Sequence, residues 1–261
     1  MSWMRWTLLS ISLFLLSAPH GVWGQYILPQ DTARIDTTQK VEQPVQEESL
    51  APETIVPPMS VLEDANTWLR RALFRGTLDA THIGAYAQYQ ITAWREGIGS
   101  YGPVLARLTI YYLGSSEWKG RDAEWLQAVY RTMDDVPTTV EYDLIVPSSS
   151  KIDEINRLLY RVDHDEIHST SLAVKEGQLD YDIADQPVLV SEETVHLYAD
   201  TFNTEKYRGS GFNGAEVVLY KVDKLPPLGF VMMGYGERGM VYTGGGSDAT
   251  PRMNVPPPPS R

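Results

Sequence analysis

Apolar and polar residues alternate along much of the chain between residues 85 and 243. This period of two is typical of β-strands with one buried face. Residues 123–132 also fit a helix, but their neighbours favour a strand. The pattern predicts strands at 85–94, 103–113, 123–132, 138–146, 194–198, 201–208, 215–222, 229–235 and 239–243. Short connections rich in Gly, Asp and Pro separate them, which predicts antiparallel pairing.

Two segments have helical spacing instead. Near 63–75, one face would carry Trp68, Leu69, Ala72 and Leu73, with Asp64 as a plausible cap and Gly76 as the end. Three serines at 148–150 precede a second such segment, whose spaced apolar residues are Ile152, Ile155, Leu158 and Leu159. The pattern therefore predicts a mostly β (α+β) fold of about eight or nine strands with two short helices.

Residues 1–24 have the layout of a signal peptide. Arg5 gives a positive start, an apolar run follows from Leu8 to Leu16, and small residues close the segment at Gly24. The apolar run is shorter than the roughly 20 residues that span a bilayer. We expect cleavage near Gly24 and no stable membrane span afterwards, which predicts a periplasmic or secreted protein of the bacterial envelope. An uncleaved membrane anchor is the alternative.

Both ends of the remaining chain differ from its middle. Residues 25–60 are rich in Pro, Glu and Gln, and 244–261 hold three consecutive glycines and four consecutive prolines. Such segments bury too little apolar area to offset their ordering entropy. We therefore expect a disordered linker at 25–60, a globular domain at 61–243 and a disordered tail at 244–261. The prolines could instead be a ligand for a proline-reading partner.

Charge and cysteine content narrow the possible partners. The chain carries 22 basic and 34 acidic residues, a net charge of −12 that becomes −13 without Arg5. An acidic chain lacks the basic footprint that nucleic acid or anionic lipid requires. The absence of cysteine excludes disulfides, thiolate metal sites and a thiol nucleophile.

Candidate catalytic chemistry is sparse in this sequence. His164 and His168 stand four apart in an acidic run, so on a helix they could share one metal ion, although a solvated turn is the favoured interpretation. Ser210 lies between two glycines but lacks the surrounding pattern of a hydrolase nucleophile. We expect no cofactor and favour a protein that is not an enzyme, with a metal-dependent hydrolase as the least favoured alternative.

Short motifs across 83–243 resemble those of a loose class of uncharacterised exported bacterial proteins. The matching segments are Ile83–Tyr89, Leu113–Gly120, Glu124–Leu126, Ala199–Phe202, Lys206–Arg208, Leu225–Gly229 and Val231–Met233. Gln88 and Asp200 depart from the class pattern, which has an acidic residue and a glycine there. The class is similar in strand order to periplasmic lipoprotein-carrier half-barrels. The resemblance implies a curved antiparallel sheet with a hydrophobic concavity, and no catalytic residue follows from it.

These observations together predict an exported protein that binds a lipid or another apolar, envelope-derived ligand on its curved sheet. Methionine adapts to irregular apolar contacts, and aromatic rings add buried area. The residues expected to contact the ligand are Trp94, Tyr112, Met232 and Met233, each of which would equally suit a core. The alternative is an envelope scaffold that binds a protein partner, with its proline-rich tails as spacers.

Overall fold

The computed structural model describes residues 59–149, 152, 154–169, 187–198, 200–211 and 214–255. The predicted signal peptide, nearly all of the predicted linker and the four consecutive prolines lie outside these residues. The described residues form α1 (Met59–Arg75), β1 (Tyr86–Arg95), β2 (Gly99–Trp118), β3 (Arg121–Thr132), β4 (Thr139–Pro147), β5 (Arg157–Val162), β6 (His168–Ser169), β7 (Val188–Leu197), β8 (Asp200–Ser210), β9 (Glu216–Lys221), β10 (Phe230–Tyr235) and β11 (Arg238–Gly246).

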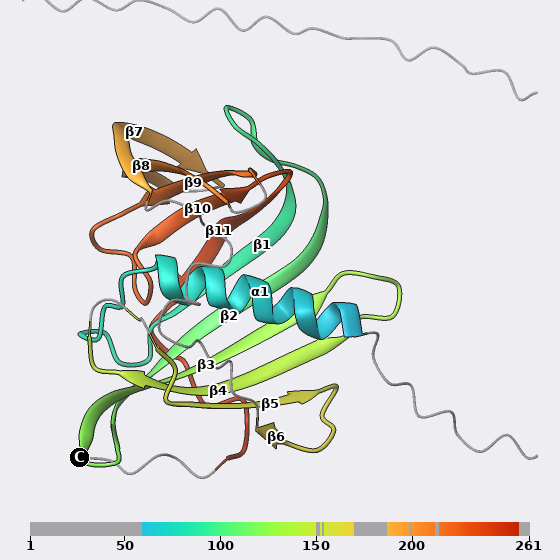
Figure 1. Cartoon of the computed structure of the whole chain (residues 1–261), viewed down its shortest axis with the longest axis vertical. Coiled ribbons are helices and arrows are strands. Elements are labelled where there is room, and N and C mark those ends of the chain that lie inside the picture. The colour runs from blue at the N-terminus through green and yellow to red at the C-terminus, as the bar shows by residue number, and fades with distance from the viewer. Residues whose placement is uncertain are drawn as a thin grey trace, which may run out of the picture. The chain divides into compact units, whose positions relative to one another are not determined.

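All eleven described strands belong to one antiparallel sheet that does not close on itself. Its order is β6-β5-β4-β3-β2-β1-β11-β10-β9-β8-β7, so β6 and β7 lie at opposite edges. Two meanders of sequential strands meet at the pairing of β1 with β11, where Tyr89 lies opposite Tyr242. Figure 1 shows that the sheet is bent and that α1 crosses one of its faces. The mostly β, antiparallel prediction is confirmed at this level of detail.

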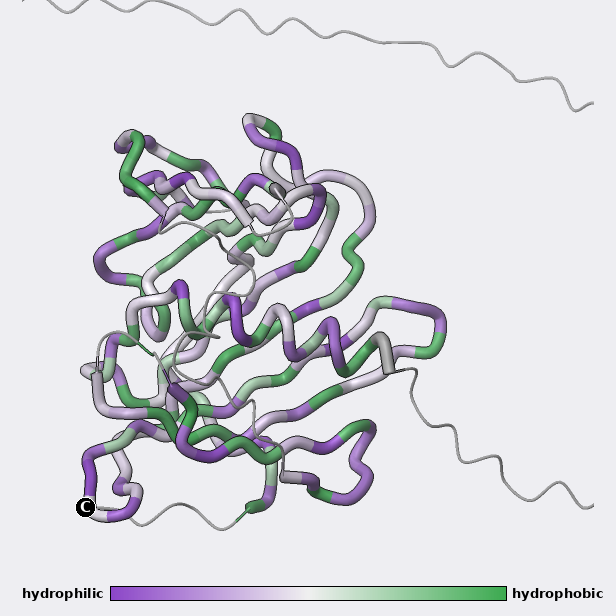
Figure 2. Tube along the Cα trace, viewed as in Figure 1, coloured by the Kyte–Doolittle hydropathy of each residue, from purple (hydrophilic) through white to green (hydrophobic). Residues whose placement is uncertain are grey.

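The helix packs by the face that its spacing predicted. Ala65, Trp68, Leu69, Ala72 and Leu73 are all fully buried. Opposite them, the sheet contributes alternate residues, among them Leu108, Tyr130 and Tyr142. Hydrophobic segments follow the strands, whereas most of the turns between them are hydrophilic (Figure 2). This face of the sheet is therefore a filled core.

Polar contacts fix the helix against the sheet. Asp64 lies within α1 and is not its cap. Its carboxylate accepts hydrogen bonds from Arg238 at 2.7 and 2.9 Å and from the Tyr130 hydroxyl at 2.5 Å. Burial raises the pKa of Asp64, but these bonds outweigh burial and hold the pKa below its ordinary value. The helix ends at Arg75, as predicted, where Gly76 donates to the carbonyl of Ala72.

Two predictions about the sheet were wrong in detail. The segment with helical spacing near 158 is strand β5, because Leu158 pairs with Leu144 and the Asn156 amide donates to the Ile145 carbonyl. The sheet also extends past 243, since Gly244–Gly246 complete β11 and the later Met253 and Val255 are buried. Hydrogen bonding to a neighbouring strand outweighed local spacing and composition in both segments.

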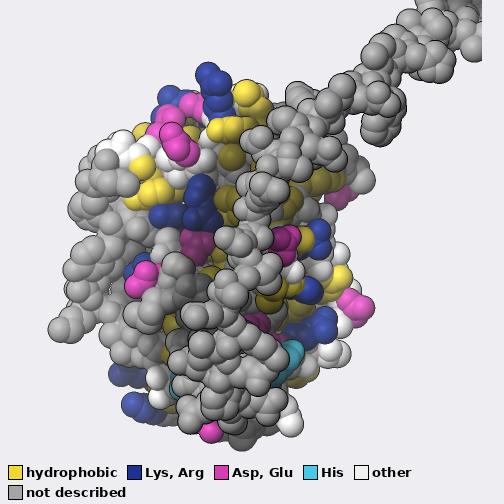
Figure 3. All heavy atoms as spheres, turned by 90° about the vertical axis from the view of Figure 1, so that its right-hand side faces the viewer, with side chains coloured by type: hydrophobic (Ala, Val, Ile, Leu, Met, Phe, Trp, Pro, Cys, Tyr) yellow, Lys and Arg dark blue, Asp and Glu magenta, His cyan; other side chains and the backbone are white. Residues whose placement is uncertain are grey.

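Charged side chains of both signs are interspersed on the surface. Figure 3 shows Lys and Arg next to Asp and Glu between hydrophobic side chains on one face. Within the described ranges, no helix is both long and apolar enough to cross a membrane.

The Trp94 ring packs so closely on Gly234 and Gly239 that a larger residue at either position should destabilise the fold. A Cβ atom added at Gly234 would lie 2.1 Å from Trp94 Nε1. We expect Gly234→Ala to lower the free energy of unfolding by about 1–3 kcal/mol, the usual cost of overpacking. In a Trp94→Ala background the same change should cost much less, because the ring is gone. Urea denaturation of the four proteins measures this coupling, and an equal cost in both backgrounds would contradict it.

Candidate functional site

A cleft of about 420 Å³ lies between the β1–β2 connection and β7. Its floor is apolar and consists of Trp94, Tyr220, Met232 and Val241. Residues 97–100 form one wall, and residues 193–198 of β7 and its turn form the other. The cleft thus joins segments from both meanders.

The pairing of the strands shows which face of the sheet forms this floor. Met232 lies opposite both Val241 and Tyr220, and directly paired residues share a face. The neighbouring Met233 lies opposite Met240, on the other face. Met240 has the same orientation as Arg238, which binds α1. The cleft therefore lies on the face opposite the helix.

The Trp94 ring forms part of the floor because it packs directly on Gly234 and Gly239, which have no side chains. Ideal Cβ atoms at Gly234 and Gly239 would approach its ring to 2.1 and 2.5 Å. The Trp94 amide donates to the Glu237 carbonyl at 2.8 Å, and its ring lies 6.5 Å from that of Tyr220. Irregular pairing around Thr92 precedes this contact. Such irregularities bend strands, so the end of the β1–β2 hairpin can lie over β10 and β11.

Ion pairs hold the two walls of the cleft together. Lys206 Nζ lies 3.1 Å from Glu96 Oε1, in the β1–β2 connection, and 3.0 Å from Glu193 Oε1, in β7. Arg208 also binds Glu96 and lies 3.3 Å from Glu216. At the other end of the β7 wall, the Tyr198 hydroxyl donates to Gln90 Oε1 at 2.7 Å.

These ion pairs change the acidity of their members. Partial burial raises the pKa of Glu96, but hydrogen bonds from Lys206 and Arg208 outweigh it, so the net pKa lies below its usual value. The hydrogen bond from Lys206 lowers the pKa of Glu193, helped by Ser191. Burial lowers the pKa of Lys206, yet the bonds to Glu193 and Glu96 raise it overall. All three groups are therefore charged at neutral pH.

The four residues expected to bind ligand divide between two places. The structure brings Trp94 and Met232 together in the cleft. Tyr112 and Met233 lie away from the cleft, and all four side chains are buried, with Trp94 5% and Met232 6% exposed. The Tyr112 hydroxyl donates to Glu124 Oε2 at 2.7 Å, and its oxygen lies 3.2 Å from the Ala80 carbonyl oxygen. Burial, with the bond to Glu124, raises the pKa of Tyr112 to about 12.

Sequence reasoning missed the rest of the floor and both walls. Tyr220 and Val241 belong to ordinary alternating strands, and nothing in their local pattern marks them. Gly97, Gly99 and Gly102 lie between the predicted strands 85–94 and 103–113, and all three have positive φ. Such backbone favours glycine and allows the tight path of the cleft wall.

The predicted histidines lie at the far part of the sheet. His164 is in the turn after β5 with its Nδ1 3.5 Å from Glu141 Oε2, and His168 is in β6. They do not share a helix, so the geometry behind the metal hypothesis is wrong. Among the described residues, no group of three or more His, Cys, Asp or Glu side chains could hold a metal ion.

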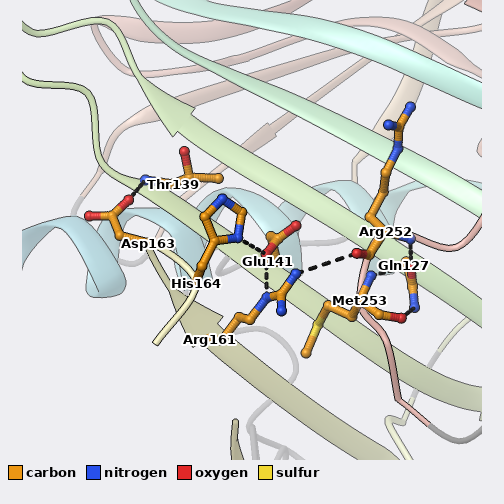
Figure 4. Close-up of polar contacts among 8 residues, drawn as sticks. All are labelled: Gln127, Thr139, Glu141, Arg161, Asp163, His164, Arg252 and Met253. Carbon is orange, nitrogen blue, oxygen red and sulfur yellow. Dashed lines mark hydrogen bonds and ion pairs between the residues drawn. The ribbon is translucent and has the colours of Figure 1, made fainter. Parts of the chain in front are cut away.

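Figure 4 shows the polar cluster around His164, where the chain's own C-terminal segment is bound. Gln127 Oε1 accepts from the amides of Arg252 and Met253 at 2.6 and 3.2 Å. Arg161 binds Glu141 and donates to the Arg252 carbonyl at 3.4 Å. The buried Gln127 thus holds a segment of backbone, which is a structural role.

Two other places do not have the geometry of a binding or catalytic site. Thr81 and Asp79 both contact Nδ1 of the exposed His82, whereas a catalytic triad uses both ring nitrogens. A hollow of about 720 Å³ beside β7 and β8 has charged walls that include Glu192, Glu205, Lys221, Asp223 and Lys224. The smaller cleft, whose floor consists of four apolar side chains, is therefore the candidate site for an apolar ligand.

Comparison with protein families and with curated sequences found no match. No protein-family model matches the chain, and no curated protein is significantly similar to it in sequence.

The depressed glutamate pKa values predict how the cleft responds to acid. The ion pairs of Glu96 and Glu193 stabilise the folded state fully above the ordinary glutamate pKa of 4.5 and are lost as pH falls through the lower folded values. We expect the walls to separate below about pH 4.5, with a change in tryptophan fluorescence. Lys206→Met should remove most of this transition. An identical acid transition in the variant would contradict the assignment.

Proposed function

We propose that this protein is an exported binding protein that holds an apolar ligand in the cleft between the β1–β2 connection and β7. The observation that carries the proposal is the apolar floor of Trp94, Tyr220, Met232 and Val241 in a space of about 420 Å³. Ligand sites are typically 300–1,000 Å³, mostly apolar, with a few polar groups at the rim.

The two faces of the sheet differ in the space that they offer to a ligand. On one face, α1 covers the sheet with Trp68, Leu69 and Leu73, all fully buried. The opposite face has the open space, which supports ligand binding there.

A binding role suits the polar groups of the cleft better than catalysis does. Glu193 and Glu96 are both paired with Lys206, so neither carboxylate is available as a base without breaking the wall contacts. We place the protein in the periplasm or outside the cell, on the layout of residues 1–24. Ligand binding would gain roughly 25 cal/mol per Å² of apolar area removed from water.

An envelope scaffold is the second candidate. Gln127 fixes the backbone at Arg252 and Met253, and the four prolines begin three residues later. The domain would therefore present them from a defined point on its surface. Deletion of residues 256–261 should abolish capture of a partner and leave ligand binding intact if this candidate is correct.

Two exposed isoleucines provide a matched test of the cleft. Ile98 is in the cleft wall and is 61% exposed, whereas Ile83 lies outside the cleft and is 66% exposed. Ile98→Asn should weaken binding of an environment-sensitive apolar dye about tenfold, because a ligand would bury this side chain. Ile83→Asn should change affinity less than twofold. Equal effects of the two variants, measured by fluorescence titration, would place the binding site elsewhere.

A further inference from the structure

The β7 wall of the cleft belongs to the last strand of the sheet. Residues 193–198 line the space. The half-buried Glu193, Val195 and Leu197 alternate with the exposed Thr194 and His196, so one face of β7 is turned inward. In the part of the chain that the structure describes, β7 pairs only with β8. Its second edge therefore has no strand partner among these residues and borders the cleft.

An edge of this kind constrains what can occupy the cleft. Every second backbone N–H and C=O group of an edge strand points away from its one partner. An alkyl chain seated there would remove these groups from water without giving them hydrogen bonds, at a cost of about 1–3 kcal/mol each. An extended backbone supplies the complementary donors and acceptors.

From this wall and the apolar floor, we infer that the ligand is an extended polypeptide segment of a partner protein, which adds to β7 as a further strand. This inference rests on the proposed function and names the class of its ligand. The added segment would turn alternate side chains toward Trp94, Met232 and Val241. The remaining side chains would face solvent. The wall from Glu193 to Tyr198 would pair with about six residues, roughly 20 Å of strand.

The surroundings of β7 indicate the composition of the segment. Glu192 and Glu193 lie in β7, and Glu205 lies opposite Glu192 in β8. These glutamates, of which Glu193 is already paired with Lys206, favour neutral or basic residues in the partner. Before these glutamates, β7 exposes Val188, Leu189 and Val190. The partner segment would extend along these residues with apolar side chains of its own.

A second copy of this chain suits the edge less well. Two β7 strands paired about a two-fold axis would bring Glu192 and Glu193 of both molecules close together. Like charges placed across a strand pair are destabilising. The acidic net charge of −12 adds to that repulsion.

The experiment uses the mature full-length chain and a capped probe peptide of alternating valine and threonine with a lysine at each end. Two versions of the probe carry N-methyl groups, one on each edge of its backbone. We expect the unmodified probe to bind. Methylation of one edge should weaken binding at least tenfold, and methylation of the other edge less than twofold. Hydrogen exchange should slow at the amides of residues 193–198, whereas those of the central strand β3 should not change.

Each contrary outcome has a distinct meaning. If both methylated probes bind as well as the unmodified one, strand addition is overturned. If the apolar dye or a fluorescent fatty acid binds and the peptide does not, the ligand is not a polypeptide, although the proposed function stands. If neither binds, both proposals fail. A stable dimer that the peptide does not dissociate would assign the edge to a second copy and overturn the inference.

Discussion

The pairing of β1 with β11 is the contact on which the rest of this structure depends. It joins the ends of the folded region, with Tyr86 opposite Gly246 and Ala93 opposite Arg238. Without it the sheet would be two separate meanders, each with an additional exposed edge. Because the paired residues are about 150 positions apart in the sequence, forming this contact costs loop-closure entropy. The helix assists, since Asp64 of α1 binds both Arg238 of β11 and Tyr130 of β3.

The same pairing creates the candidate site. It places β1 next to β11 and β10, so that Trp94 reaches the notch formed by Gly239 and Gly234. The bent end of the β1–β2 hairpin then faces β7, the edge strand of the other meander. Ion pairs from Glu96 to Lys206 and Arg208 hold the hairpin there. One tryptophan therefore belongs both to the core and to the floor of the cleft, which couples the stability of the fold to the shape of the cleft.

The two faces of the sheet differ because large side chains fill one of them, whereas the other leaves an open space. The face toward α1 is closed by large side chains, and Asp64 binds Arg238 and Tyr130 there. On the other face, the C-terminal segment covers part of the first meander through Gln127, and the hairpin covers part of the second. The space that remains is bounded by an apolar floor and a strand edge. The floor packs best against apolar side chains, and the strand edge pairs best with backbone amides. An extended polypeptide supplies both.

The sequence by itself determined the class of the fold, because the alternation of apolar residues and the spacing of Trp68, Leu69, Ala72 and Leu73 are local properties. It failed where pairing outweighed local pattern, as at Leu158 in β5 and at Gly244–Gly246 in β11. It also nominated Trp94, Tyr112, Met232 and Met233 without separating them. Alternation places Met232 and Met233 on opposite faces, but which face is covered by a helix depends on contacts far apart in the chain. Only the tertiary structure decided that Trp94 and Met232 meet in a cleft, because their contact requires both meanders to be joined.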